Sequence, residues 1–362
     1  MIKRLRVNAN GMFVGTLAMN HDGEVAFQYS EEWLKNGFSL NPIKLPLINE
    51  VFIATSPYFR GLFGVFADSL PDSYGELLLD RFLRQKGIDL ASLSPLDRLA
   101  YVGSRGMGIL EYVPDYSEEF RLTSYDFDYL QKECDALLDA KEVEDIRSLY
   151  ALGGSSGGAR PKSLIRYENE DWIVKFSAKF DPKNIGDLEY KTMSLAKKAG
   201  ISVPEIRLVT SSSGNRYFLI KRFDRDNKKK IHMITAAALL ECDFRAPALD
   251  YVDLLKLTRV LTADDADVIE MFRRMVFNVL AGNQDDHAKN FAFLYDEADK
   301  KYRLAPAYDI TPSKTFYGEH TTSVNGKGKD IGDAEMLVVA EKSRIPRKTA
   351  ESIIASIKKV LK

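Results

Sequence analysis

The sequence has few of the features that mark secreted, disulfide-stabilised or membrane-embedded proteins. It contains two cysteines, Cys134 and Cys242, which lie in separate segments and match no metal-ligand spacing. We therefore expect buried thiols in a reducing compartment. No apolar run approaches the ~18 residues that a transmembrane helix needs, and the basic start at residues 1–7 lacks the apolar stretch and cleavage site of a signal peptide. These absences predict a cytoplasmic protein with no membrane partner.

An excess of charge of either sign is also missing. The 51 Lys and Arg residues and the 52 Asp and Glu residues give a net charge of −1, which argues against a protein that coats nucleic acid by itself. Two local basic stretches, residues 228–230 and 342–362, are interpreted as solvated surface. The four histidines are scattered along the chain, so they do not predict a metal site.

The chain is long enough for two or three domains. Its 362 residues are 45% hydrophobic and 28% charged, ordinary values for a soluble globular protein. In residues 1–120 the patterns predict strands over 5–8, 12–17 and 25–29 and a helix over 72–85. Residues 121–250 begin with a helical connector and continue as four strand-like stretches around a helix over 187–199. From residue 251 the pattern is helical, over 251–261, 263–281 and 346–361.

The most specific feature is the segment Asn283-Gln-Asp-Asp-His-Ala-Lys-Asn-Phe291. In protein kinases a catalytic-loop Asp accepts the proton of the acceptor hydroxyl, an Asn five residues later binds Mg²⁺, and a downstream Asp holds the bridging metal. Asp285, Asn290 and Asp309 fit these three roles. Asp286 is a second candidate base, although it lies only four residues before Asn290. The pattern predicts phosphoryl transfer with ATP and Mg²⁺.

A glycine-rich stretch, Gly153-Gly-Ser-Ser-Gly-Gly158, is the candidate phosphate loop. Glycines let backbone N–H groups approach phosphate oxygens, but such a run is also typical of a flexible linker, and it lacks the Walker pattern. Lys175, at the end of an apolar strand, and Glu189, on the following helix, match the lysine and glutamate that kinases pair. Because all these parts occur in kinase order, we predict a kinase.

Three further features carry two interpretations each. The stretch Lys221-Arg-Phe-Asp-Arg225 is either the strand that leads to a hinge beside adenine, with Phe223 as its apolar edge, or a buried core strand. Lys289 either stabilises the charge of the transferring phosphoryl group or forms a structural ion pair. His287 is either a metal ligand or a structural residue of the catalytic loop beside the nucleotide, and the absence of a second histidine nearby favours the structural role.

With these motifs the chain resembles the HipA-like serine/threonine kinases, the toxin components of bacterial type II toxin–antitoxin modules. The resemblance covers nearly the whole chain. It rests on residues 283–291, 304–313 and 221–225, and in the N-terminal part on residues 27–34, 45–47 and 66–72. It implies an α+β, protein-kinase-like two-lobe fold with three parts. These are an N-terminal α+β subdomain (1–120), a connector with a small β-rich nucleotide lobe (121–250) and a mainly helical catalytic lobe (251–362).

The resemblance also implies roles for the loop. In that family the loop that corresponds to residues 155–162 binds the phosphates and carries an autophosphorylated serine. This serine aligns with Ser155, and the adjacent Ser156 leaves the assignment open by one residue. A phosphate there adds a charge of about −1.5 to −2 where the phosphates of ATP must bind, so we expect self-inactivation. The residues expected at the nucleotide are Ser155, Ser156, Gly157, Gly158, Ala159, Lys162, Lys175, Glu189, Lys221, Phe223 and His287.

Three functions compete. The leading hypothesis is a growth-arresting kinase that phosphorylates a protein such as an aminoacyl-tRNA synthetase, binds a HipB-like helix-turn-helix antitoxin and reaches DNA only through it. The alternative is a catalytically silent scaffold or co-repressor, against which the intact Asp285, Asn290 and Asp309 argue. A small-molecule phosphotransferase would need an acidic acceptor pocket, for which Glu241 and Asp243 are the obvious candidates.

Overall fold

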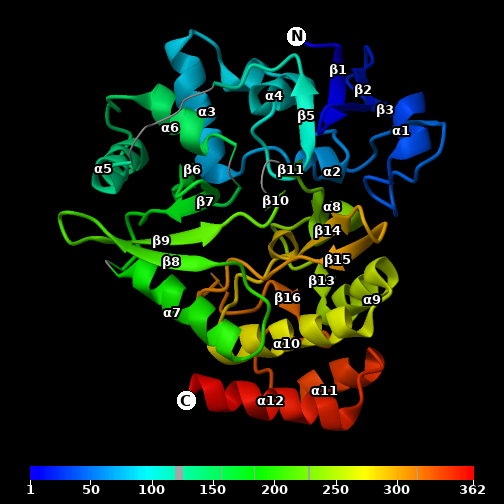
Figure 1. Cartoon of the computed structure of the whole chain (residues 1–362), viewed down its shortest axis with the longest axis vertical. Coiled ribbons are helices and arrows are strands. Elements are labelled where there is room, and N and C mark those ends of the chain that lie inside the picture. The colour runs from blue at the N-terminus through cyan, green and yellow to red at the C-terminus, as the bar shows by residue number, and fades with distance from the viewer. Residues whose placement is uncertain (119–124, 156, 183, 227–228, 316) are drawn as a thin grey trace. The chain divides into compact units, whose positions relative to one another are not determined.

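The chain divides into two compact units. The computed structural model describes residues 1–118, 125–155, 157–182, 184–226, 229–315 and 317–362, so the candidate Ser156 lies outside the described residues. The first unit comprises Met1–Asp187 and Ile206–His232, and the second comprises Leu188–Glu205 and Met233–Lys362 (Figure 1). None of the helices in these described ranges is long and apolar enough to cross a membrane.

The N-terminal part of the first unit is built on a five-stranded antiparallel sheet in the order β4-β3-β2-β1-β5. The predicted hairpin is confirmed, and its turn residues Asn10 and Gly11 both have positive φ, which fits a tight hairpin turn. The strands are β1 (Arg4–Ala9), β2 (Met12–Met19), β3 (Val25–Tyr29), β4 (Val51–Ile53) and β5 (Leu110–Val113). The helices are α1 (Glu31–Asn36), α2 (Gly64–Ala67), α3 (Ser73–Gln85), the short 3-10 helix η1 (Leu90–Ser92) and α4 (Pro95–Val102).

A second antiparallel sheet of the first unit has the order β6-β7-β9-β8. Its strands are β6 (Lys162–Tyr167), β7 (Glu170–Lys175), β8 (Ile206–Thr210) and β9 (Arg216–Lys221), and a short hairpin follows, formed by β10 (Arg225–Asp226) and β11 (Lys229–Lys230). Helices α5 (Phe127–Leu138) and α6 (Ile146–Gly153) precede the sheet. The four predicted strands are thereby confirmed.

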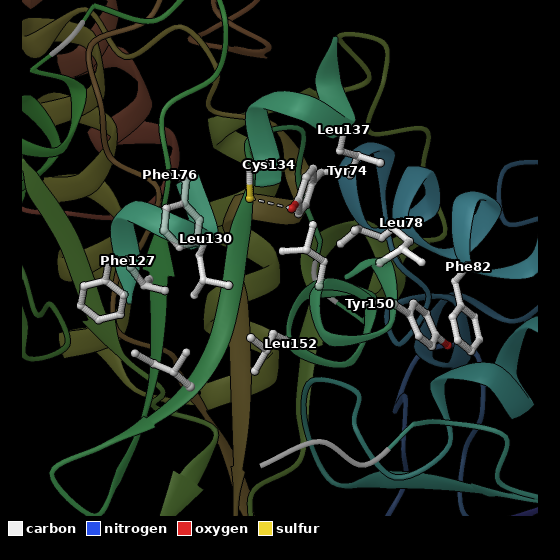
Figure 2. Packing of buried hydrophobic residues seen from close by; sticks show 14 of the residues in the cluster. Tyr74, Leu78, Phe82, Phe127, Leu130, Cys134, Leu137, Tyr150, Leu152 and Phe176 are labelled. Atoms are coloured by element: carbon white, nitrogen blue, oxygen red, sulfur yellow. Dashed lines mark hydrogen bonds between the residues drawn. The ribbon is translucent and has the colours of Figure 1, made fainter. Parts of the chain in front are cut away.

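One buried cluster joins α3, α5 and α6 to this sheet (Figure 2). Trp172 of β7 is fully buried in it, and Tyr74 of α3 lies with its hydroxyl 3.1 Å from the sulfur of Cys134 on α5. Burying a large apolar side chain stabilises a fold by about 1.5–3 kcal/mol, so this cluster fixes the helices on the sheet. Cys134 is the buried thiol that was expected, whereas Cys242 in the second unit is only half-buried.

Asp128 of α5 connects this helix to the β8–β9 hairpin through side-chain hydrogen bonds. Its carboxylate accepts hydrogen bonds from Asn215 Nδ2 at 2.9 Å, Ser213 Oγ at 2.7 Å, Tyr217 Oη at 2.7 Å and Ser211 Oγ at 3.0 Å. These bonds, those from Asn215 and Ser213 first, hold the pKa of the Asp128 carboxyl well below its usual range. A single side chain therefore connects residues more than eighty positions apart in the sequence.

Replacing Asp128 by alanine is expected to destabilise the first unit by about 1 kcal/mol, since several partly solvated hydrogen bonds are lost together. Both tryptophans of the chain, Trp33 and Trp172, belong to the first unit, so a urea titration followed by tryptophan fluorescence reports on this unit. Glu50→Ala, which removes an exposed carboxylate from the same unit, is the matched control. Equal midpoints for the two variants would contradict a fastening role for Asp128.

The second unit is mainly helical. Helix α9 (Tyr251–Thr262) packs against α10 (Asp265–Ala281), and α12 (Arg347–Leu361) packs on α10, which confirms the three predicted helices. The side chains of Asp250 and Asp264 cap α9 and α10 by accepting backbone N–H groups. The other helices are most of α7 (Ile185–Lys198), α8 (Ala236–Leu240), the 3-10 helix η2 (Ala288–Asn290) and α11 (Asp333–Lys342). The strands are β12 (Met233–Thr235), β13 (Leu249–Asp250), β14 (Ala292–Asp296), β15 (Lys301–Leu304) and β16 (Thr322–Ser323).

The interpretation of residues 228–230 as solvated surface is wrong for Lys230. Its side chain is 18% exposed, and its ammonium donates to the carbonyl oxygen of Ser104 at 2.5 Å and to Glu111 at 2.7 Å. Burial lowers the pKa of Lys230, and the bond to Glu111 opposes that shift. A local charge pattern does not reveal this pairing, because Glu111 lies on β5, far away in the sequence.

Candidate active site

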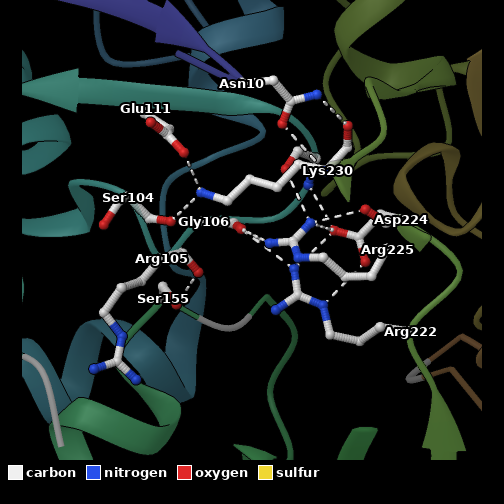
Figure 3. Close-up of polar contacts among 11 residues, drawn as sticks. Asn10, Ser104, Arg105, Gly106, Glu111, Ser155, Arg222, Asp224, Arg225 and Lys230 are labelled. Carbon is white, nitrogen blue, oxygen red and sulfur yellow. Dashed lines mark hydrogen bonds and ion pairs between the residues drawn. The ribbon is translucent and has the colours of Figure 1, made fainter. Parts of the chain in front are cut away.

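The glycine-rich loop runs from the end of α6 to the start of β6 in the first unit. Ser155 donates its hydroxyl to the carbonyl oxygen of Arg105 at 3.0 Å (Figure 3). The backbone N–H of Gly158 donates to Asp72 Oδ2 at 3.3 Å. Gly158 has a φ of +90°, a backbone state that favours glycine, and its Cα lies close enough to Lys162 that an added Cβ would be 2.6 Å from Nζ. The loop therefore brings backbone close to an ammonium group, as phosphate binding requires.

Lys162 and Lys175 lie directly opposite each other on β6 and β7. Opposed residues of an antiparallel pair point to the same face of the sheet, so both side chains share one face. Phe218 of β9 is the next residue in this row, and Lys175 Nζ lies 5.7 Å from the centre of its ring. Two basic side chains therefore share one face of the sheet at the end that follows the glycine loop.

The stretch after β9 is held by a buried ion cluster (Figure 3). Asp224 is fully buried and accepts hydrogen bonds from Arg222 at 3.0 and 2.7 Å, from Arg225 at 2.7 Å and from the backbone N–H of Gly108 at 2.7 Å. Both arginines also donate to the carbonyl oxygen of Gly106. The residues beside it include two of the predicted hinge positions.

Lys221 and Phe223 alternate with these buried residues. Both are half-buried, and Lys221 pairs with Glu170 of β7 at 3.1 Å. Arg160, at the far end of the glycine loop, is held by both carboxylate oxygens of Asp181. Ala159, next to it, is exposed. The first unit thus contains all the predicted phosphate-side and hinge candidates except Ser156, which is not described, and Glu189 and His287, which belong to the second unit.

The predicted catalytic loop follows α10 in the second unit. Gly282 ends this helix with a φ of +71°, and η2 closes the loop at Asn290. The side chain of Asp285 is 63% exposed, and Asn290 Nδ2 donates to the carbonyl oxygen of Asp285 at 2.8 Å. This bond occupies the amide nitrogen of Asn290, and the amide oxygen is the atom with the chemistry to bind a metal. His287 Nε2 lies 4.0 Å from Asp285 Oδ1.

Asp286, the competing base, is fully buried. Its carboxylate accepts hydrogen bonds from Tyr251 Oη at 2.8 Å and from the backbone N–H groups of Thr321 and Thr322 at 3.0 and 3.2 Å, and it pairs with His320 Nδ1 at 2.9 Å. Burial and the neighbouring Asp286 raise the pKa of Tyr251 well above its usual value, so its phenol stays protonated. Because these four partners surround Asp286, the geometry favours Asp285 as the group that meets a substrate.

The segment that carries Asp309 lies against the catalytic loop. Tyr308 Oη donates at 2.7 Å to the carbonyl oxygen of Lys289, the residue that precedes Asn290. The buried Arg274 of α10 donates to the carbonyl oxygen of Ala305 at 2.7 Å and holds the approach to this segment. Asp309 itself has a φ of +52°, an uncommon backbone state that is seen at functional sites.

The oxygen groups of Asn290 and Asp309 fit Mg²⁺, which binds through one or two protein carboxylates or amides together with substrate phosphates. Among the described residues no group of three or more His, Cys, Asp or Glu side chains gathers as a metal cage. A kinase metal site does not need such a cage, because the nucleotide supplies the remaining oxygen ligands. Asn290 and Asp309 offer oxygen atoms only, which differs from the sulfur and nitrogen ligands of a structural zinc site.

The aromatic ring of Phe244 contacts the basic side chains of Lys289 and Arg245 and the ring of His287. Lys289 Nζ lies 4.4 Å and Arg245 Cζ 4.6 Å from the centre of its ring, and the ring of His287 packs edge-on at 5.9 Å. Glu189 is buried on α7 of this unit. Glu241 and Asp243, the candidates for an acidic acceptor pocket, are half-buried in the segment that leads to Phe244.

Sequence patterns missed the residues that hold this loop in place. Tyr251, His320, Thr322 and Ser313 all bond to it, yet they lie between 28 and 36 positions away from their partners. Their residue types are common, and no spacing rule connects them to Asp286. One signal in the sequence was available. Asp286 lies directly beside the candidate base Asp285, and this second Asp indicates a structural role that requires partners elsewhere in the chain.

Comparisons with known proteins identify both parts of the chain. Residues 5–113 match the model of the HipA N-terminal domain, and residues 154–362 match that of the HipA-like C-terminal domain. The Sinorhizobium fredii protein named "Putative kinase Y4mE" is 25% identical, with 92% of this chain and 83% of that protein covered. A second protein of that organism, "Putative kinase Y4dM", is 32% identical, with 42% of this chain but only 40% of the relative covered.

The serine/threonine-protein kinase toxin HipA of Shewanella oneidensis is 21% identical over 96% of this chain and 88% of its own length. A solved structure of HipA from this organism, in complex with HipB and operator DNA, superposes with a TM-score of 0.74 at 18% identity. The superposition covers 99% of this chain and 90% of that one. The likeness shows the same α+β, kinase-like fold. Since the C-terminal model alone matches more than half of the residues, the chain belongs to the HipA family of kinases.

Proposed function

We propose that this protein is an ATP- and Mg²⁺-dependent serine/threonine protein kinase that acts as the toxin of a toxin–antitoxin pair. The observation that carries the proposal is that two neighbouring carboxylates differ in burial and hydrogen bonding. Asp286 is buried and bonded on all sides, while Asp285 is exposed beside Asn290. A catalytic base has to reach a substrate hydroxyl, whereas a carboxylate with a structural role does not. The arrangement therefore supports a catalytic role for Asp285 and a structural role for Asp286.

Each group of side chains has a role in the proposed reaction. Asp285 accepts the proton of the acceptor hydroxyl as that oxygen attacks the γ-phosphorus, and the bond from the γ-phosphorus to the bridging oxygen breaks to release ADP. Asn290 and Asp309 would hold Mg²⁺, which would neutralise charge on the phosphates. Lys162, Lys175 and the backbone of the glycine loop bind the phosphates, and Lys289 stabilises negative charge on the transferring group. The stretch at Lys221 and Phe223 contacts the base of the nucleotide.

The family relationship supports the wider role. The related Shewanella HipA was solved together with HipB and operator DNA, and we propose that this chain likewise binds a HipB-like helix-turn-helix antitoxin, through which it reaches DNA. Its substrate is proposed to be a component of translation, such as an aminoacyl-tRNA synthetase in the cytoplasm. Autophosphorylation of Ser155 would replace the hydroxyl that now donates to Arg105 by a dianion. This charge would repel ATP phosphates from the loop.

Incubation of the purified protein with ATP and Mg²⁺, alone and together with host lysate, followed by mass spectrometry, tests the proposal. Phosphate is expected on a serine of the loop or on a protein of the host lysate, and only with Mg²⁺ present. Asp309→Asn, which removes a metal-binding carboxylate, is the matched negative control. The silent-scaffold function would gain support if no phosphate were transferred and if ATP with Mg²⁺ left the melting temperature unchanged, since a ligand at ~100 times its dissociation constant adds about 2.7 kcal/mol.

A further inference from the structure

Gln284, the residue directly before Asp285, is bonded through all of its polar groups to one later segment. This segment, residues 313–321, follows the metal-binding candidate Asp309, and all of it except Phe316 lies within the described ranges. The backbone N–H of Gln284 donates to Ser313, and its carbonyl oxygen accepts two hydrogen bonds from Thr321, each at 3.0 Å. The side-chain amide accepts from the N–H of Thr315 at 3.1 Å and donates to the carbonyl oxygen of Gly318 at 2.9 Å.

The same segment reaches the backbone of Asp285 through Ser313. The hydroxyl of Ser313 accepts the N–H of Asp285 at 3.2 Å and donates to Asn283 Oδ1 at 3.1 Å, while its own N–H donates to the carbonyl oxygen of Gly282 at 3.0 Å. Asn283 and Ser313 also form a parallel bridge. The position of the candidate base therefore depends on where residue 313 lies.

A turn inside the segment orients two of its backbone groups toward the side chain of Gln284. Thr315 donates its hydroxyl to the carbonyl oxygen of Glu319 at 2.6 Å and accepts the N–H of Glu319 at 3.0 Å. This turn presents the N–H of Thr315 and the carbonyl oxygen of Gly318 to one planar amide, whose donor and acceptor match them. In many kinases the segment after the metal-binding Asp is ordered instead by a phosphorylated residue paired with arginine.

We propose that Gln284 is a positioning residue that orders the segment 313–321 and, through Ser313, fixes the backbone of Asp285, so that no phosphorylated residue is needed in this segment. This inference rests on the proposed kinase function. Gln284 acts through Asp285, whereas Lys162, Lys175 and the glycine loop, which are proposed to bind ATP by its phosphates, belong to the first unit. Loss of the glutamine therefore lowers kcat and leaves KM for ATP unchanged.

The test uses the full chain with two substitutions. Gln284→Ala removes both side-chain bonds, and Gln284→Glu keeps the shape and the acceptor but removes the donor to Gly318. Hydrogen exchange of peptides that cover residues 313–321 is expected to rise in both variants. The phosphorylation rate is expected to fall about 10–100-fold in Gln284→Ala and at least as much in Gln284→Glu, because the new carboxylate oxygen faces the carbonyl oxygen of Gly318 with no proton between them. KM for ATP should stay within about twofold. Gln28→Ala, at an exposed glutamine of β3, is the matched control and should change neither measurement.

Three outcomes would overturn the inference. Exchange that stays at the wild-type level would show that Gln284 does not order the segment. Faster exchange with an unchanged phosphorylation rate would leave the glutamine a purely structural role. Phosphate found on Thr315 or Tyr317 of active enzyme, with activity lost when a phosphatase removes it, would show that modification does the ordering. A wild-type chain that transfers no phosphate would instead contradict the kinase function, and the exchange measurement would still show whether Gln284 orders the segment.

Discussion

Replacing Asp285 by asparagine is expected to lower the rate of phosphoryl transfer about 10²–10⁴-fold, the range that a positioned general base contributes. The substitution keeps the shape of the side chain and removes its ability to take a proton. Because 63% of the side chain is exposed, the change should cost little stability. Initial rates at saturating ATP, KM for ATP and the melting temperature of the variant check this prediction together, and only the rate should change.

The neighbouring Asp286→Asn variant provides the contrast. Its carboxylate is fully buried, and an amide cannot accept every hydrogen bond that Asp286 now receives. We expect a loss of about 1–3 kcal/mol of unfolding free energy, as for other buried groups left without partners. A folded Asp286→Asn enzyme without activity, combined with full activity of Asp285→Asn, would reverse the two assignments.

The local part of this site could be predicted from the sequence, and the part built from distant segments could not. Asp285 and Asn290 are close because one short loop carries both, so their spacing is enough to identify them. The opposition of Lys162 and Lys175 depends on the register of a hairpin, which their positions alone leave undetermined. The hydrogen-bond partners of Asp286 come from α9 and from residues 320–322, and the spacing within a single sequence does not connect them.

The prediction of helices and strands was limited in the same way. Strands and helices with a clear period and a clear cap, such as the hairpin of β1 and β2 and the capped α9 and α10, were predicted close to their observed bounds. Helix α11 was missed, and its weak amphipathic pattern gives little signal of a buried face. The hairpin of β14 and β15 was also missed, because its strands are short and directly follow the catalytic motif.

Replacing Asp224 by alanine is expected to destabilise the first unit by about 3–5 kcal/mol. The carboxylate is fully buried between Arg222 and Arg225, whose side chains are 7% and 12% exposed. Removing it leaves two buried guanidinium groups without the anion that compensates them, and breaking a buried ion pair from one side costs this much. A urea titration followed by tryptophan fluorescence measures the loss, since Trp33 and Trp172 both report on this unit.

The effect should depend on pH with a defined sign. Burial alone would raise the pKa of the Asp224 carboxyl, but Arg222, Arg225 and the N–H of Gly108 lower it to about 2. This folded-state pKa lies below the unfolded value of about 3.9. The stabilisation is therefore complete above about pH 4 and is lost as the pH falls toward 2.

The difference in unfolding free energy between wild type and Asp224→Ala should accordingly be smaller at pH 3 than at pH 7. Asp22→Ala, at an exposed carboxylate of the same unit, should show neither the loss nor its pH dependence. A difference that stays constant from pH 7 to pH 3 would mean that Asp224 acts through shape alone. In that case Asp224→Asn, which keeps the shape and removes the charge, would be as stable as the wild type at every pH.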